Sequence, residues 1–199
     1  KAYEEGITQN VDVVIVNELA TTGYSPADLL DRPAFCAAVE RINHEIIKQI
    51  GETALIFGSL EKNRHGSGPD LVNVALVAHQ GECIHRTEKQ LLPTYDVFDE
   101  KRYFRPGEHQ QPFELKGHKI GIVICEDLWG NDNKRVYTRY LTDPVALQAK
   151  EGAEILISLS ASPFSTGKSS YRTELVQHHA KTHALPMVDV NQAGANTEL

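Results

Sequence analysis

The chain has 199 residues, of which 41% are hydrophobic and 24% are charged, a composition typical of one domain with its own core. A formal net charge of -7 excludes a basic surface for nucleic acid or for an anionic membrane. No apolar run approaches the length of a membrane span, and the first residues show no signal-peptide pattern.

The apolar patterns predict strands that alternate with helices, beginning with a buried strand over 11–16 that follows the tail of a helix. A helix is expected over 26–50, with Ser25 as its cap and Pro26 in its first turn. The patterns then predict a strand over 54–61, a loop over 62–70, antiparallel strands over 71–79 and 82–89 joined at Gln80-Gly81, a strand over 119–125, a helix over 143–151, a strand over 153–160, a helix over 169–183 and a strand over 186–191. This alternation predicts an α/β fold with a mixed sheet, and the apolar strands indicate that both faces of the sheet are covered.

Three of the predicted strands lead into groups that can take part in one reaction, namely Glu18, Lys89 and Cys125. In α/β proteins the ends of different strands can converge on one crevice, where such folds bind ligands. A carboxylate can take the proton of a thiol and return it to a leaving amine, while an ammonium favours the thiolate and stabilises an oxyanion. Together these groups would form an amide-cleaving site that needs no histidine.

Cys125 also has a simpler interpretation, because a buried cysteine at the end of a strand is usually an inert apolar side chain. The only other cysteines are Cys36 and Cys83, so the set does not form a disulfide framework and fits a reducing compartment such as the cytoplasm. No metal site is expected, since no cysteine has a histidine at ligand spacing. The adjacent His178 and His179 would project about 100° apart on a helix.

Three motifs resemble, in chain order, those of the nitrilase superfamily: VNELATTGY around Glu18, TEKQLLPTYDVFDEKRYFRPG from Lys89, and VICEDLW around Cys125. The stretches TGYSPADLLDRP and LSASPFSTGK resemble its glutaminase branch, found in glutamine-dependent NAD synthetases. The resemblance covers nearly the whole chain and implies a mixed-sheet αββα sandwich. It implies that Glu18, Lys89 and Cys125 are catalytic, and that Glu100 hydrogen-bonds the lysine unless it is a solvated loop carboxylate. One departure is Asn17, where the superfamily commonly has a proline.

The same resemblance implies a set of substrate-binding residues. Tyr95 and Glu126 would meet the substrate glutamine, and Trp129 would line its pocket, although core packing explains a tryptophan there equally well. Ser162 and Lys168 of SPFSTGK match positions that recognise the α-amino and α-carboxylate ends of glutamine. Lys168 would meet the carboxylate as a point charge, and its alternative is an ordinary surface lysine.

The implied function is hydrolysis of glutamine to glutamate and ammonia through a cysteinyl thioester, with the ammonia used to make NAD from deamido-NAD. Residues 1–199 resemble the middle of such a glutaminase domain, so we expect a domain that is incomplete at both ends and belongs to a longer chain. No cofactor is expected in this domain, because ATP and Mg would belong to the synthetase domain, which these residues lack. The implied partners are glutamine, that synthetase domain and further copies of the chain in a homo-oligomer.

Two other functions stay open on the sequence. A free-standing nitrilase-type amidase or carbamoylase would use the same catalytic residues but would need no groups for an α-ammonium and an α-carboxylate. A non-catalytic, truncated domain would keep the fold without the activity, although the intact Glu18, Lys89 and Cys125 argue against an evolved loss of catalysis.

Overall fold

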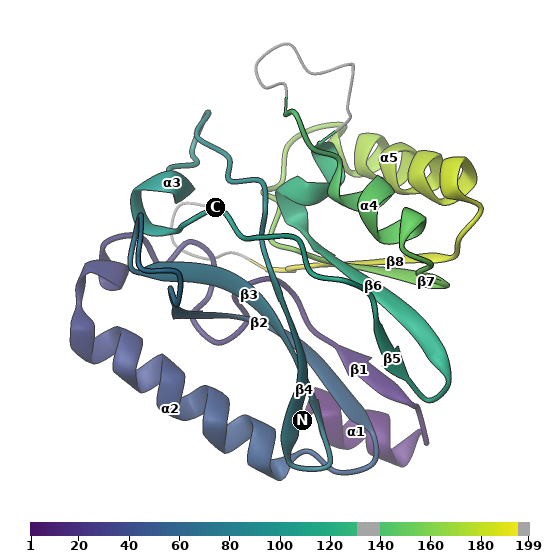
Figure 1. The fold of residues 1–199 in the computed structure, drawn as a ribbon, viewed down its shortest axis with the longest axis horizontal. Helices are drawn as coiled ribbons and strands as arrows, with labels where there is room; N and C mark the ends of the chain where they lie inside the picture. The colour runs from purple at the N-terminus through teal and green to yellow at the C-terminus, as the bar shows by residue number, and fades with distance from the viewer. Residues whose placement is uncertain (131–139, 195–199) are drawn as a thin grey trace.

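The computed structural model describes residues 1–130 and 140–194, which form two mixed sheets of four strands each (Figure 1). The first sheet has the order β1-β2-β3-β4, with β1 parallel to β2 and the other neighbours antiparallel. The second has the order β5-β6-β7-β8, with β5 antiparallel to β6 and the other neighbours parallel. The strands are Val13–Ile15 (β1), Ala54–Lys62 (β2), Leu71–His79 (β3), Glu82–Glu88 (β4), Phe113–Leu115 (β5), His118–Ile124 (β6), Ile155–Ser160 (β7) and Met187–Asn191 (β8).

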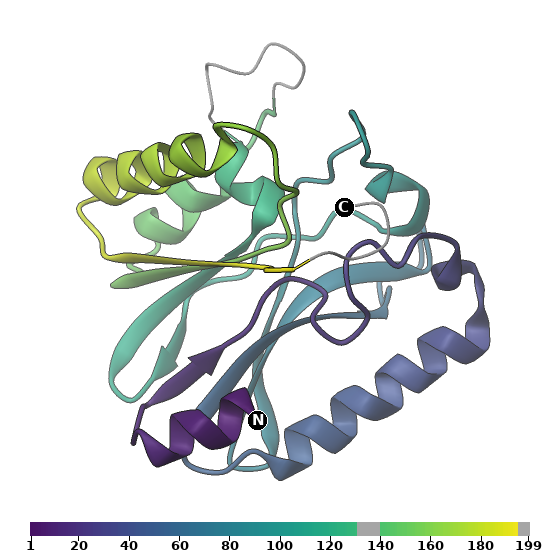
Figure 2. The ribbon, with the colours of Figure 1, turned by 180° about the vertical axis from the view of Figure 1, so that it is seen from behind.

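Helices cover the outer face of each sheet, so the layers follow the order helix, sheet, sheet, helix (Figure 2). The first sheet carries α1 and α2, and the second carries α4 and α5. This arrangement confirms the mixed-sheet αββα sandwich that the resemblance implied. The helices are Ala2–Thr8 (α1), Pro33–Gln49 (α2), Glu100–Tyr103 (α3), Pro144–Lys150 (α4) and Lys168–His183 (α5), with 3-10 helices at Ala27–Asp31 (η1) and Cys125–Trp129 (η2).

The alternation of side chains along each strand separates the interior into layers. Ile56 of β2 packs between the sheets with Ile122 of β6, in one buried cluster that both sheets share. Its neighbour Phe57 points the other way and packs with Ile46 of α2. β2, β3, β6 and β7 have apolar neighbours on both faces, which explains the nearly continuous apolar sequences from which covered sheets were predicted.

The helix predicted over 26–50 is wrong in its first turns. The structure has the short η1, an extended residue at Arg32 (φ -101°, ψ 106°), and then α2, which begins at Pro33. A proline disfavours the helical conformation in the residue before it, so one helix cannot pass through Arg32. Pro33 is therefore the first-turn proline of the long helix, and the cap residue of η1 is Pro26, not the predicted Ser25.

The predicted hairpin is confirmed. β3 and β4 pair antiparallel around Gln80 and Gly81, whose φ angles are 51° and 79°. Positive φ at both central residues is characteristic of the tight turns that match the twist of the strands. The short β5 and α3 were not predicted, because three or four residues show no recognisable hydrophobic period.

One close approach of backbones positions the loop after β1. Gly58 of β2 donates its N–H to the carbonyl of Asn17 at 3.1 Å. A Cβ atom added to Gly58 would lie 2.4 Å from the nitrogen of Leu19 and 2.6 Å from the Cα of Glu18. The lack of a side chain on Gly58 therefore allows the Glu18 segment to lie directly against the sheet.

We expect Gly58→Ala to lower the free energy of unfolding by about 1–3 kcal/mol, because the new methyl group must push backbone atoms aside. Urea denaturation measures this change. Gly51→Ala is the matched control, since a Cβ atom there would meet nothing within 4 Å. Equal stability of the two variants would contradict the proposed close packing at Gly58.

Candidate active site

The three residues singled out at the ends of predicted strands lie buried at the ends of three strands. Glu18 follows β1, Lys89 directly follows β4, and Cys125 directly follows β6 as the first residue of η2. Their exposed fractions are 0%, 1% and 6%. Since β1 and β4 belong to the first sheet and β6 to the second, the two sheets together form the site.

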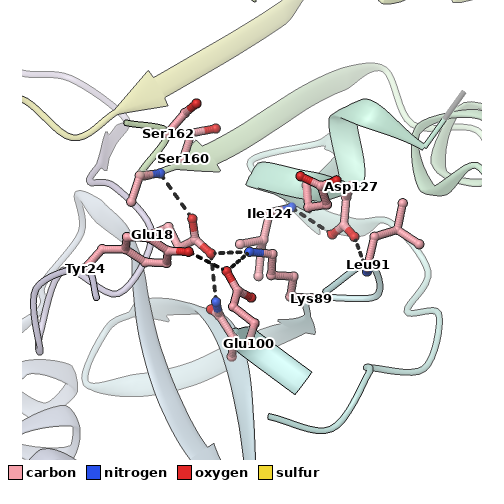
Figure 3. A network of polar contacts seen from close by, with 12 residues as sticks. Glu18, Tyr24, Lys89, Leu91, Glu100, Ile124, Asp127, Ser160 and Ser162 are labelled. Carbon is pink, nitrogen blue, oxygen red and sulfur yellow. Dashed lines mark hydrogen bonds and ion pairs between the residues drawn. The ribbon is translucent and has the colours of Figure 1, made fainter. Parts of the chain in front are cut away.

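The ammonium group of Lys89 links two carboxylates. Its Nζ lies 2.7 Å from Oε1 of Glu18 and 2.7 Å from Oε1 of Glu100 (Figure 3). Burial opposes the charge of this lysine, but Glu100 and Glu18 outweigh it and raise the pKa of Lys89 well above its usual value. Lys89 is therefore a permanent buried cation, and Glu100 makes the contact with it that the resemblance implied.

Glu18 is held at both of its oxygens. Oε1 accepts hydrogen bonds from Lys89 and from Nδ2 of Asn73, at 2.7 and 2.8 Å, and Oε2 accepts the N–H of Ala161 at 3.1 Å. Asn73 also accepts the backbone N–H of Lys89 at its carbonyl, at 2.9 Å. One asparagine near the start of β3 thus orients both the carboxylate and the lysine. At Asn17, the departure from the usual proline, the side-chain amide donates to the carbonyl of Glu18 at 2.8 Å.

Glu100 has a different environment. The hydroxyl of Tyr24 donates to Oε1 of Glu100 at 2.8 Å, and within the described residues Oε2 has no hydrogen-bond partner. Burial raises the pKa of Glu100 to about 7, with Glu18 acting in the same direction and Lys89 against it. Glu100 therefore gains a proton near neutral pH.

Cys125 begins a tight turn at the end of β6, with φ at 46°, in the left-handed region. Burial and the charge of Glu18 raise the pKa of its thiol well above the usual value, although Lys89 acts in the opposite direction. Lys89 lowers the pKa of the thiol, as expected from the sequence, but burial and Glu18 raise this pKa by more. The resting group is thus the thiol, and attack by sulfur requires a base that removes its proton.

A second pair of predicted residues also lies together. Oε2 of the buried Glu126 accepts a hydrogen bond from the hydroxyl of Tyr95 at 2.8 Å, and Oε1 accepts one from Tyr140 at 2.9 Å. Glu126 follows Cys125 directly, so this carboxylate has a fixed place next to the nucleophile candidate. Tyr140 was not predicted, since it lies far from the recognised motifs.

The remaining predicted residues divide between a cavity and the core. Ser162 and Lys168 line a cavity of about 310 Å³, which also includes Tyr24 and Arg172. Trp129 does not line this cavity. It is buried in the cluster between η2, α4 and α5, and it also borders a separate surface hollow with Lys168.

Three residues that hold the site were missed by the sequence reasoning. Asn73 carried a signal, because it is a polar residue inside the apolar run LVNVALVAH, and buried polar side chains need a partner. Tyr24 and the amide of Ala161 carried none, because their partners lie 76 and 143 residues away in the chain.

In the described part of the chain, no group of three His, Cys, Asp or Glu residues could hold a metal ion. Residues 1–130 and 140–194 also contain no helix that is long and apolar enough to cross a membrane.

Comparison with known proteins identifies the family. Residues 1–199 match the carbon-nitrogen hydrolase family over their whole length. The chain belongs to this family. This carbon-nitrogen hydrolase is 37% identical to a glutamine-dependent NAD(+) synthetase of Synechocystis, over 96% of the chain, and 32% identical to that of Acinetobacter baylyi, over 98%. It spans 35% and 33% of the lengths of these two relatives.

Solved structures agree with the fold. The glutamine-dependent NAD+ synthetase of Acinetobacter baumannii superposes with a TM-score of 0.84 at 30% identity, covering 96% of this carbon-nitrogen hydrolase and 34% of that chain. An amidase of the nitrilase superfamily from Nesterenkonia superposes with a TM-score of 0.75 at 19% identity, covering 98% and 68% of the two chains. This second likeness concerns the fold alone.

We expect Lys89→Met to destabilise the fold by about 3–5 kcal/mol at about pH 8, because it leaves Glu18 and Glu100 buried without their cation. The pKa of Glu100 is already raised, and loss of Lys89 raises it further, so the folded variant binds protons more tightly than the unfolded chain. Its stability then falls as pH rises, and the deficit should be smaller at about pH 5.5. Urea denaturation at the two pH values measures both effects.

Lys116→Met is the control for this experiment, since Lys116 is 42% exposed and pairs with Asp12 on the surface. Its effect should stay below about 1 kcal/mol at both pH values. A deficit of Lys89→Met that is the same at both pH values would contradict the assignment of Lys89 as the counterion of two buried carboxylates.

Proposed function

We propose that this carbon-nitrogen hydrolase cleaves glutamine to glutamate and ammonia through a cysteinyl thioester. The observation that carries the proposal is the meeting of Glu18, Lys89 and Cys125 in one buried cluster that both sheets build. The choice of glutamine is supported by the similarity to glutamine-dependent NAD(+) synthetases at 37% and 32% identity.

In the first half of the proposed reaction, Glu18 removes the thiol proton of Cys125 and the sulfur attacks the γ-amide carbon of glutamine. A tetrahedral intermediate forms, in which the former carbonyl oxygen carries a negative charge. Glu18 then gives its proton to the amide nitrogen, the carbon–nitrogen bond breaks, and ammonia leaves a γ-glutamyl thioester on the sulfur.

In the second half, Glu18 removes a proton from a water molecule, and the resulting hydroxide attacks the thioester carbon. When this second tetrahedral intermediate collapses, the carbon–sulfur bond breaks, glutamate leaves, and the proton held by Glu18 returns to sulfur. The thiol and the carboxylate are thereby restored. Glu18 suits this repeated exchange because its position is fixed by Asn73 and by the N–H of Ala161.

Lys89 supplies the positive charge for both tetrahedral intermediates. Its raised pKa keeps it charged throughout, and burial makes its attraction for an oxyanion stronger than it would be in water. Glu18 and Glu100 hold it through two bonds to Nζ, each 2.7 Å long. Glu100 accordingly acts on the reaction through Lys89 and makes no contact with the substrate in this mechanism.

Two groups of residues would hold the ends of glutamine. Glu126 and Tyr95 would hold the α-ammonium, since a buried carboxylate is its natural partner. Ser162 and Lys168 would bind the α-carboxylate in the cavity that they line. Trp129 would support Lys168 from the neighbouring hollow.

The ammonia would be used by a synthetase domain that makes NAD from deamido-NAD, in the same chain or in a partner. ATP and Mg would act in that domain, while the glutaminase domain would need no cofactor. The relatives to which this chain is similar are named as glutamine-dependent NAD(+) synthetases, and the chain spans about a third of their length.

We place the reaction in the cytoplasm, with the domain assembled as a homo-oligomer. The free thiols of Cys36, Cys83 and Cys125 are compatible with a reducing compartment.

We expect glutamine to be hydrolysed at least ~10⁴-fold faster than butyramide, measured as kcat/KM from ammonia release, because butyramide lacks the two charged groups that the site would bind. Lys168→Ala should raise the KM for glutamine by ~10-fold or more, the loss expected for a hydrogen bond to a charged group. Its slow cleavage of butyramide should hardly change.

Lys181→Ala is the matched control, because Lys181 is an exposed lysine in the last turn of the same helix, α5. It should leave both substrates unaffected. Similar rates for glutamine and butyramide would indicate a general amidase instead. A folded chain that cleaves neither substrate would indicate a non-catalytic domain.

A further inference from the structure

Asp127 has a set of contacts that the proposed mechanism does not use. It lies in η2, two residues after Cys125, and only 1% of its surface is exposed. Its Oδ1 accepts the N–H groups of Leu91 and Gln90 at 2.8 and 3.1 Å, and its Oδ2 accepts the N–H of Ile124 at 2.9 Å (Figure 3). Both oxygens of this buried carboxylate are thus bonded to backbone amides.

These three amides flank two catalytic candidates. Gln90 and Leu91 directly follow Lys89 at the end of β4, and Ile124 directly precedes Cys125 at the end of β6. Since β4 and β6 belong to different sheets, the side chain of Asp127 connects the two halves of the sandwich beside the reacting groups. A change in this connection would alter the position of Lys89 relative to Cys125.

The connection uses a carboxyl group where a non-ionisable side chain would be easier to bury. In residues 1–130 and 140–194 no cation forms an ion pair with Asp127, and burial raises its pKa to about 7 although the three amides and Lys89 act in the opposite direction. A carboxylate can accept all three N–H groups, whereas an asparagine of the same size has one acceptor oxygen and an NH₂ group that would face a donor.

The backbone of Lys89 is also held on the side of the first sheet. Its N–H donates to the carbonyl of Asn73 at 2.9 Å, and its carbonyl accepts the N–H of Gly107 at 2.7 Å. These bonds fix Lys89 within its own half of the molecule. The bonds to Asp127 also fix where this segment lies relative to the turn that contains Cys125.

We propose that Asp127 is a positioning residue that sets the distance between the Lys89 ammonium and the Cys125 sulfur by joining the two backbone segments. It touches neither the substrate nor the reacting atoms. The effect on turnover rests on the proposed hydrolysis of glutamine, whereas the effect on the thiol does not depend on it.

The test compares Asp127→Asn and Asp127→Ala with the wild type. We expect Asp127→Asn to lower kcat for glutamine by ~10²-fold, the loss typical of a displacement of about 1 Å, with KM changed less than ~3-fold. Alkylation of Cys125 by iodoacetamide should become half-maximal at a higher pH, because a more distant Lys89 supports the thiolate less. Asp127→Ala, which loses all three bonds, should show larger effects.

Asn43→Ala controls for a simple loss of stability. Asn43 is a buried residue of α2 that bonds to the carbonyl of Leu60 at 3.2 Å and accepts the hydroxyl of Ser59 at 2.7 Å. This variant should be less stable than the wild type but should keep its kcat and its alkylation profile.

A folded Asp127→Asn with the kcat and alkylation profile of the wild type would overturn the proposal. Failure of both Asp127 variants to fold would also overturn it, because Asp127 would then be a folding residue. If the wild type does not hydrolyse glutamine, the proposed function fails, and the shift in the alkylation profile alone decides the role of Asp127.

Discussion

The structure depends on one buried ammonium group that lies between two carboxylates. Lys89 cannot stay charged in the interior without Glu18 and Glu100, and these carboxylates in turn need Lys89 to compensate for the water they have lost. The three groups come from the segment after β1, the segment after β4 and the start of α3. Their pairing therefore fixes how these separate segments meet, and it leaves a permanent positive charge near Cys125.

Close backbone packing makes this pairing possible. Gly58 lets the Glu18 segment lie on β2, and a Cβ atom at Gly107 would come within 2.3 Å of the Cβ of Glu88, the residue before Lys89. Asn73 then bonds both to the Glu18 carboxylate and to the backbone of Lys89. The catalytic candidates are thus held by groups of the rigid sheet, which is the usual requirement for precise geometry at a reacting centre.

Local signals in the sequence were sufficient for much of the fold and for the burial of Glu18, Lys89 and Cys125 at strand ends. The Gln80-Gly81 turn could be predicted because tight hairpin turns have a local sequence signal, and Pro33 carried the information needed to place the start of α2 correctly. The division of the strands into two sheets came only from the family resemblance. The bonds of Tyr24 and Asp127 join segments 76 and 36 residues apart, so no local pattern could reveal them. Trp129 could not be assigned for a similar reason, because one aromatic side chain suits both a pocket wall and the core.

The central claim is that the cluster around Lys89 makes Cys125 the nucleophile that attacks glutamine. The most direct measurement is incubation of the protein with a diazoketone analogue of glutamine, followed by mapping of the adduct by peptide mass spectrometry. We expect a single adduct on Cys125, and excess glutamine should slow its formation. An adduct on Cys36 or Cys83, with Cys125 unmodified, would contradict it.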